Sequence, residues 1–134
     1  MDEQDPRDLS GFKKKSFALP YGGGEIWFEH LDGVYIHEAL VLEKLNADLP
    51  RFRRPSMTSL ICFVLSETAL TPAIIAAIAT ALTDTSKVFR RVCFVGADKK
   101  SEHALRVELR RAAFAIAFME DLEKAKEWLV REAQ

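Results

Sequence analysis

Hydrophobic positions along this chain follow two different spacings, and the two spacings alternate. Three segments have the pattern of β-strands: an unbroken apolar run at 60–65, a run at 89–95 that contains Arg90 and Arg91 near its start, and an alternating run at 113–119. The segments between and after them space their apolar residues in the manner of helices. The helices predicted in this way cover residues 35–49, 72–82, 99–112 and 122–131, the last capped by Asp121.

A glycine-rich hairpin precedes these elements, at residues 17–31. Gly22, Gly23 and Gly24 supply the positive φ angles that a tight turn between two strands needs. A phosphate-binding loop is disfavoured, because a strand and not a helix N-terminus follows the glycines. Alternation along the second strand predicts two faces, with Ile26, Phe28 and His30 on one and Trp27, Glu29 and Leu31 on the other.

The resulting order is β-β-α-β-α-β-α-β-α. Strands that alternate with helices predict an α/β fold with a mostly parallel sheet and right-handed crossovers, here with an N-terminal hairpin and about four covering helices. At 134 residues the chain has the length of one domain. We therefore expect a single domain at 16–134, after a polar, mobile tail at 1–15.

Composition and charge exclude several classes of protein. The chain is 49% hydrophobic and 29% charged with a net charge of −1, so it has no overall attraction for nucleic acid or anionic membranes. Its longest apolar run, 69–82, is shorter than the roughly 20 residues of a membrane-spanning helix. The polar N-terminus lacks the apolar core of a signal peptide. We expect a cytoplasmic protein in which Cys62 and Cys93 are free, buried thiols.

The most informative stretch is 60–82, a predicted strand, a short turn and a helix almost without charge. Thr71 is placed to cap this helix and Pro72 to occupy its first position. Such a helix must bury nearly its whole surface or meet a partner with it. Ile74, Ile75, Ile78 and Leu82 are predicted to face the sheet, and Ala76, Ala77, Ala79, Thr80 and Thr83 to line the far side.

Three places in the chain carry a family resemblance. Leu31-Asp32-Gly33 leads into a helix at His37-Glu38-Ala39, LICFVLSETALTPAIIAAI forms a strand-turn-helix, and RRVCFVGAD leads through a helix to FMEDLEKAKEWLV. Over residues 17–130 the chain resembles the SpoIIAA-like or STAS fold, named for sulfate transporters and anti-sigma-factor antagonists. The ending is most similar to the SpoIIAA-like branch also called STAS/SEC14-domain proteins.

The resemblance implies a regulatory domain that is not an enzyme and acts on a protein partner, either another protein or a second copy of itself. Phospho-regulated antagonists carry Asp-Ser-Ser-Gly at the turn after the third strand, where this chain has Thr71-Pro72-Ala73-Ile74. The serine switch is therefore absent, and Thr71, the one remaining phosphorylation candidate, is better explained as a cap. The predicted interface comprises Thr71, Pro72, Ala73, Ala76, Ala77 and Thr80.

A rival function is that of a carrier for an apolar small molecule or lipid, as the SEC14-like label implies. It requires a pocket between the sheet and the helices. The aromatic residues able to line such a pocket are Trp27, Phe28, Phe94, Phe114 and Phe118, although aromatic side chains more often fill a core.

Other chemistry has weaker support, and no catalytic, metal or cofactor site is predicted. Carboxylates at predicted strand ends (Glu67, Asp98, Glu120 and Asp121) suit Mg²⁺, but two of them precede helices and are placed to cap them. Basic residues gather near two strand starts: Arg51, Arg53, Arg54, Arg90 and Arg91. They form either a solvated rim, which we favour, or a site for an acidic partner or phosphate. His30, His37 and His103 lie on separate elements without a nucleophile beside them.

Overall fold

The computed structural model describes residues 5–131 and confirms the α/β class and the predicted order of elements. The strands are β1 (Phe17–Tyr21), β2 (Gly24–His30), β3 (Leu60–Val64), β4 (Arg91–Val95) and β5 (Ala115–Met119). The helices are α1 (Ser10–Lys13), α2 (Glu38–Phe52), α3 (Pro72–Thr83), α4 (Lys99–Glu108) and α5 (Leu122–Val130), preceded by a 3₁₀ turn at Pro6–Asp8.

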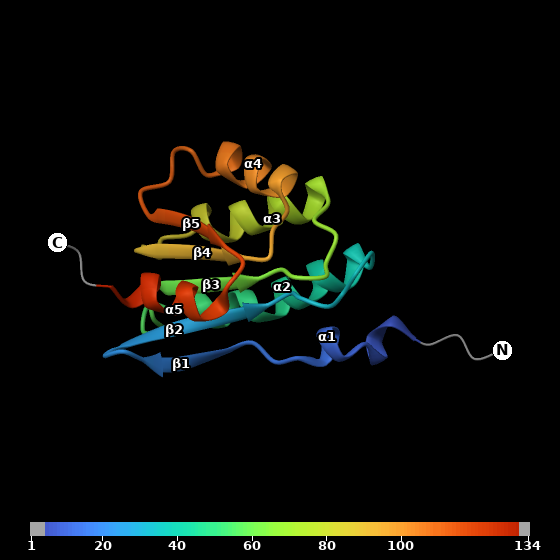
Figure 1. The fold of residues 1–134 in the computed structure, drawn as a ribbon, viewed down its shortest axis with the longest axis horizontal. Coiled ribbons are helices and arrows are strands. Elements are labelled where there is room, and N and C mark those ends of the chain that lie inside the picture. Colours follow the sequence, from blue (N-terminus) through green and yellow to red (C-terminus); the bar gives the residue numbers. More distant parts are fainter. Residues whose placement is uncertain (1–4, 132–134) are drawn as a thin grey trace.

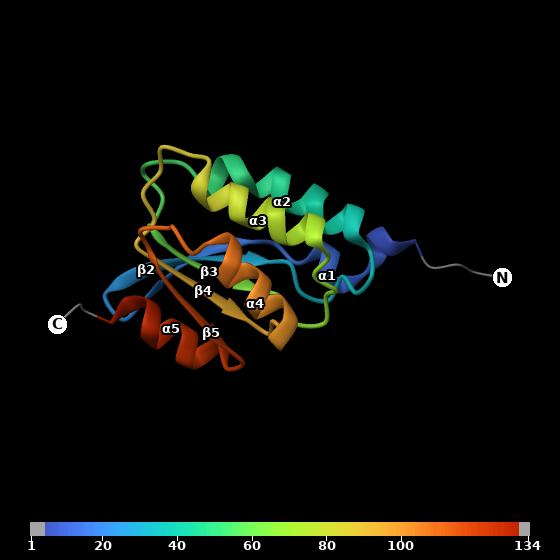
Figure 2. The same ribbon diagram turned by 90° about the horizontal axis from the view of Figure 1, so that it is seen from above.

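The five strands form one sheet in chain order, β1-β2-β3-β4-β5 (Figure 1). β1 and β2 form the predicted antiparallel hairpin, and every later neighbour is parallel, with Trp27 opposite Ile61 and Cys62 opposite Cys93. Because the strand order never reverses, right-handed crossovers place α2, α3 and α4 on the same side of the sheet. Figure 2 shows α2 and α3 on one side of the sheet and α5 on the other, and Leu105 of α4 packs in the same core as α2 and α3.

The sheet separates two hydrophobic cores. On the first side Trp27, Phe63 and Phe94 pack beneath the three crossover helices, and each is at most 1% exposed. On the second side α5 buries Ala125 and Leu129 against Ile26, Phe28 and Cys62 of β2 and β3. The predicted alternation along β2 is confirmed, since Ile26 and Phe28 lie in the second core and Trp27 and Leu31 in the first.

Helix α2 begins later and ends later than the apolar spacing predicts. Residues 35–37 form an irregular turn, and the helix runs past Pro50, where a break was expected, to Phe52. Proline inside a helix removes one main-chain hydrogen bond. Burial of Phe52 against the rings of Trp27, Phe63 and Phe89 offsets that loss.

Three other elements are shorter than the sequence predicts. α4 ends at Glu108 and not at residue 112, β4 begins at Arg91 and not at residue 89, and β5 begins at Ala115 and not at residue 113. The segment between α4 and β5 therefore becomes a loop. Periodicity alone misplaced these ends because apolar residues in the connecting segments, such as Phe89, still pack into the core.

The N-terminal segment, predicted as a mobile tail at 1–15, makes specific contacts wherever it is described. Gly11 lies against the carbonyl groups of Asp32 and Gly33, so closely that a Cβ atom at this position would overlap them. The Lys14 ammonium lies 2.6 Å from the Asp32 carboxylate. The Arg7 guanidinium pairs with Glu43 of α2 at 2.6 Å. These contacts hold 7–14 on the domain, whereas residues 1–4 lie outside the described chain.

Candidate contact site at the carboxyl edge of the sheet

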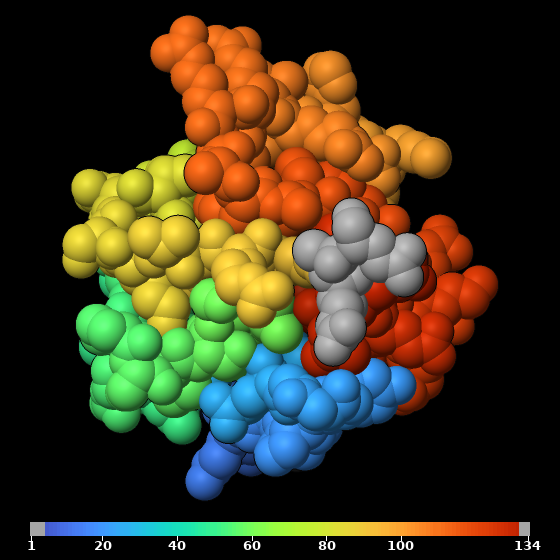
Figure 3. Space-filling model, turned by 90° about the vertical axis from the view of Figure 1, so that its left-hand side faces the viewer, coloured from blue at the N-terminus to red at the C-terminus, as the bar shows by residue number. Residues whose placement is uncertain are grey.

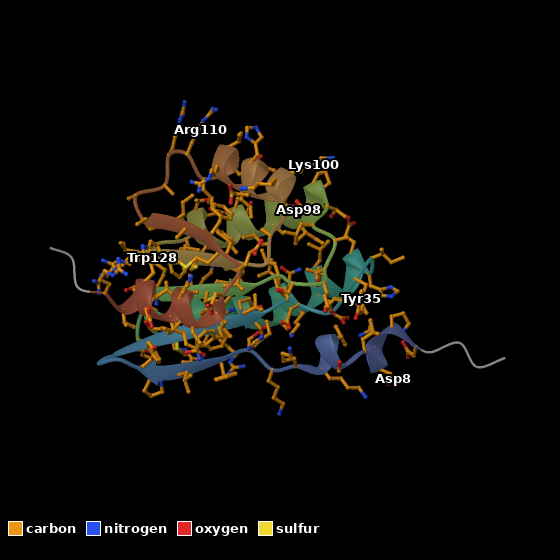
Figure 4. The ribbon with its side chains drawn as sticks, in the orientation of Figure 1. Asp8, Tyr35, Asp98, Lys100, Arg110 and Trp128 are labelled. Carbon is orange, nitrogen blue, oxygen red and sulfur yellow. The ribbon has the colours of Figure 1, made fainter. Side chains whose placement is uncertain are left out.

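The parallel strands β2 to β5 all end at one edge of the sheet, which we call the carboxyl edge. The loops that follow these strands lead into the N-termini of α2, α3, α4 and α5. Figure 4 places Tyr35 and Asp98 toward this end of the molecule. In open α/β sheets this is the edge at which ligands usually bind.

Two non-glycine residues at this edge have strained backbones, and they contact each other. Tyr35 has a φ of 52° and Glu67 a φ of 57°, a region that costs an ordinary residue about 1–2 kcal/mol. The Tyr35 amide donates to the Glu67 carbonyl at 2.9 Å, and its hydroxyl donates to Glu67 Oε2 at 3.1 Å. The same carboxylate raises the pKa of Tyr35. Two loops that are distant in sequence are thereby joined directly before α3.

Thr71 caps α3, as the sequence predicts. Its backbone is extended, with φ −75° and ψ 163°, and its Oγ1 accepts a hydrogen bond from the Ile74 amide at 3.3 Å. Pro72 occupies the first turn, where its missing N–H is no loss. The hydroxyl of Thr71 therefore has a structural role that is independent of any modification.

The outer surface of α3 is exposed and carries no charge. Pro72, Ala73, Ala76 and Thr80 are exposed, whereas Thr71 and Ala77 are half-buried. The prediction that Ala79 lines the far side is wrong, because that residue is 5% exposed in the first core. The four predicted sheet-facing residues, Ile74, Ile75, Ile78 and Leu82, are all buried.

Two further exposed side chains extend this surface. Ile36 is 81% exposed and Tyr35 is 50% exposed, and the Tyr35 carbonyl accepts a hydrogen bond from Ala69 in the loop before α3. The sequence placed both residues inside a helix and so missed them. We define the Thr71 surface as Tyr35, Ile36, Thr71, Pro72, Ala73, Ala76, Ala77 and Thr80.

Three of the four carboxylates predicted near this edge, Glu67, Asp98 and Asp121, have local partners, and Glu120 is exposed. Asp98 Oδ1 accepts from the Ser101 amide at 2.7 Å and Asp121 Oδ1 from the Glu123 amide at 2.8 Å, so both cap helices. Hydrogen bonding to Ser101 lowers the pKa of Asp98. Across residues 5–131 no three His, Cys, Asp or Glu side chains converge in a way that suits a metal ion.

Most of the predicted basic rim binds the chain itself. Arg53 caps the C-terminus of α3, with its guanidinium 2.9 Å from the Ala81 carbonyl and 2.8 Å from that of Thr80. Arg91 donates to the Trp128 carbonyl at 2.6 Å, and Arg51 lies over the Trp27 ring. Arg54 and Arg90 are exposed. Three of these five arginines therefore stabilise the fold.

The five aromatic residues proposed to line an apolar pocket do not surround a common hollow. Trp27, Phe28 and Phe94 are at most 2% exposed. The Phe94 ring stacks on that of Phe118, with 5.1 Å between centroids. Phe114 instead lines an open surface groove, at the opposite end of the sheet from the Thr71 surface.

That groove has a volume of about 460 Å³ and lies between the α3–β4 loop and the α4–β5 loop. Figure 3 views this end of the molecule, with the first loop in yellow and the second in orange. Apolar residues such as Val88, Phe89 and Phe114 share its lining with Lys87 and Arg111. It is open to solvent and does not extend between the sheet and the helices.

A buried acidic pair was not recognised from the sequence. Glu29 is 0% exposed on the α2 side of the sheet, and its Oε1 accepts from Trp27 Nε1 at 2.9 Å. Glu29 Oε2 and Asp48 Oδ2 are both buried, and no donor from the rest of the described chain reaches either oxygen. This arrangement fits a proton shared between the two carboxyl groups. Burial first, and then the hydrogen bond to Asp48, raise the pKa of Glu29 to about 9. Glu29 is therefore protonated at neutral pH.

The two cysteines are free and buried, as predicted. Cys62 and Cys93 are register neighbours on β3 and β4, beneath α5. The hydrogen bond to Cys93 and burial raise the pKa of the Cys62 thiol. A protonated, buried thiol is a poor nucleophile, so this pair belongs to the core.

No family model matches the chain, and no curated protein or solved structure matches it. Among the described residues, no helix has both the length and the apolar character needed to cross a membrane.

Proposed function

We propose that this chain is a non-enzymatic regulatory or interaction domain of the SpoIIAA-like (STAS) type, acting in the cytoplasm through protein–protein contact at the Thr71 surface. The observation that carries the proposal is the strained pair Tyr35–Glu67 beside an exposed, uncharged helix face. Backbone strain that the fold itself does not require is concentrated at functional sites.

The main-chain hydrogen bond that joins the two loops does not require a side chain at either position. Glycine accepts both φ values without cost, so a sequence under selection for stability alone would place glycine at 35 or 67. Tyr35 and Glu67 instead present side chains to solvent, next to Ile36. An exposed tyrosine and an exposed isoleucine beside small side chains are what a protein partner can bury.

The proposed contact operates without a serine phosphorylation switch. Thr71-Pro72-Ala73-Ile74 stands where the resemblance places the acceptor serines, and the Thr71 hydroxyl is used as a cap. The rival function as a lipid carrier has no specific observation in its favour, because three of its five proposed pocket residues are core residues.

A charge on the Thr71 surface tests this proposal. Ala76→Glu is preferable to Ala77→Glu, because Ala76 is exposed whereas Ala77 packs partly against the core. Ala47→Glu, on the exposed face of α2, is the matched control. Sedimentation velocity reports self-association, and affinity capture from an extract of the source organism reports other partners.

We expect Ala76→Glu to lose the self-association or a captured protein that wild type and Ala47→Glu both retain. Ile36→Asp should lose the same partner, because it changes the other end of the same surface. Folded Ala76→Glu and Ile36→Asp proteins that keep every association of the wild type would contradict the proposal.

A further inference from the structure

The outer edge of β5 is unpaired, and its hydrogen-bonding groups can be assigned. The Ala115 amide donates to the Arg90 carbonyl at 3.1 Å, and the Gly96 amide donates to the Met119 carbonyl at 3.0 Å. In a parallel ladder the N–H and C=O of one residue point to the same side. Residues 115, 117 and 119 therefore bond to β4, while Ile116 and Phe118 turn their main-chain groups outward. No described strand pairs with that side.

This edge lacks the features that usually prevent pairing with another chain. β5 reads AIAFM, with neither charge nor proline, and its side chains are half-buried or exposed. The opposite edge strand, β1, contains Pro20, which has no N–H to offer. An apolar edge left open in this way is a template for an added strand.

Helix α4 and the loop that follows it form a basic wall beside the β5 edge, in which Arg106 also lies 3.8 Å from Glu102 of the same helix. The two elements run side by side in Figures 1 and 2, and the Arg106 guanidinium lies 4.7 Å from the centroid of the Phe118 ring. Residues 99–111 contain five Lys or Arg and two Glu, although the whole chain has a net charge of −1. Figure 4 labels Lys100 in the first turn of this helix and Arg110 in the loop just beyond its end.

The two ends of β5 are flanked by charges of opposite sign. Arg110 and Arg111 precede the strand and are exposed, whereas Glu120 and Asp121 follow it. Near the end of β5, Glu102 and Asp98 join Glu120 around a hollow of about 380 Å³ that Lys99 also lines. A complementary partner strand must therefore carry its negative charge where β5 begins.

We propose that the β5 edge, with α4 as its wall, binds an extended segment of a partner protein as a sixth strand, with the acidic end of that segment against Arg106, Arg110 and Arg111. The outward groups of Ile116 and Phe118 supply main-chain hydrogen bonds, and the arginines select the acidic end. This surface is distinct from the Thr71 surface and does not depend on the function proposed for it.

A second copy of this chain is the rival occupant of the edge. In antiparallel pairing of two β5 strands about a twofold axis, Glu120 and Asp121 of each copy would lie near Arg110 and Arg111 of the other, so charge alone does not exclude it. We expect sedimentation velocity to give a monomer, or a dimer that Ile116→Pro leaves intact. A dimer that Ile116→Pro dissociates would assign the edge to a second copy and overturn the proposal.

Titration of the ¹⁵N-labelled chain with short peptides tests the proposal. The probes are acetylated, amidated EEVTVT and TVTVEE, which place the acidic pair near the start of β5 for a parallel or an antiparallel strand, with KKVTVT as the charge control. We expect one acidic peptide to shift the amides of Ile116 and Phe118 saturably and to slow their hydrogen exchange, and KKVTVT to do neither.

Two variants separate the main-chain and side-chain contributions. Ile116→Pro removes the isoleucine side chain and an outward N–H, and Ile116→Ala removes the side chain but keeps that N–H. The proline variant should bind the peptide about fivefold or more weakly than the alanine variant, as expected for one lost hydrogen bond. Arg106→Glu should weaken binding further, whereas Lys13→Glu, next to α2 and far from β5, should not.

Three other results of the titrations would also overturn the proposal. One is the absence of any shift at β5 with millimolar peptide. Another is a set of shifts confined to α4 without slower exchange at Ile116 and Phe118, which would indicate a simple ionic contact. The third is tight binding of an oligonucleotide or of anionic vesicles by α4 while both acidic peptides remain inert.

Discussion

Replacement of Glu29 by glutamine should abolish a steep pH dependence of stability. Glutamine has the shape of a protonated glutamic acid. Its amide nitrogen can donate to Asp48 Oδ2, and its oxygen can accept from Trp27 Nε1 as Glu29 Oε1 does at 2.9 Å. Glu29→Gln thus keeps the hydrogen bonds of the buried pair and removes its proton.

The magnitude follows from the pKa of Glu29, about 9 in the folded chain against an ordinary value of 4.5. Between these values the folded state holds a proton that the unfolded state has released. The free energy of unfolding therefore falls by about 1.4 kcal/mol per pH unit as the pH rises through this window. The contribution is complete below pH 4.5, and about 3 kcal/mol of it is lost by pH 7.

Urea unfolding of wild type and Glu29→Gln, followed by circular dichroism from pH 5 to pH 9, measures this difference. The two proteins should have similar stability at pH 5 and diverge as the pH rises, with glutamine more stable by about 3 kcal/mol at pH 7. Glu25→Gln, an exposed change on the same strand, should follow the wild type. Parallel curves for wild type and Glu29→Gln across the whole range would show that Glu29 holds no proton in the folded chain.

Two other predictions concern the Thr71 surface. Glu67→Gly should raise the unfolding free energy by about 1 kcal/mol, because glycine relieves the positive φ, whereas Glu67→Ala, which keeps the strain, should not. Urea denaturation compares the two, and equal stabilities would refute the strain argument. Thr71→Ala should lower the free energy of unfolding by about 1 kcal/mol through loss of the α3 cap, and Thr71→Ser, which keeps a capping hydroxyl, should retain the stability of the wild type. A thermal melt of Thr71→Ala identical to that of wild type would contradict the capping role.

The elements were predictable because their signals are local. Alternation along β2, the apolar runs of β3 and β4 and the capping residues Thr71, Asp98 and Asp121 are readable within a few residues. The extension of α2 past Pro50 was not readable, since it depends on the rings around Phe52, which come from β2, β3 and the segment before β4. A local rule for proline cannot anticipate a tertiary contact of that kind.

The candidate site was predictable only on α3. The exposed, uncharged face at Ala73, Ala76 and Thr80 follows from helical spacing, but the positive φ of Tyr35 and Glu67 leaves no mark in the sequence. Glu29, in contrast, did leave a mark in the sequence. A carboxylate at the core-facing position between Trp27 and Leu31 signals a buried acid that needs a partner. Its partner Asp48, nineteen residues later on α2, is identified only by the fold.

The two proposed surfaces can be tested separately because different parts of the fold support them. The Thr71 surface depends on loops at the carboxyl edge that the Tyr35–Glu67 contact joins, whereas the β5 edge is defined by the ladder to β4 and by Arg106. Ile116→Pro leaves the N–H groups of 115, 117 and 119 in that ladder, and Ala76→Glu lies outside it. A partner that fails to bind both variants would therefore have to reach across α4 from one surface to the other. A partner that fails to bind only one variant belongs to the surface which that variant changes.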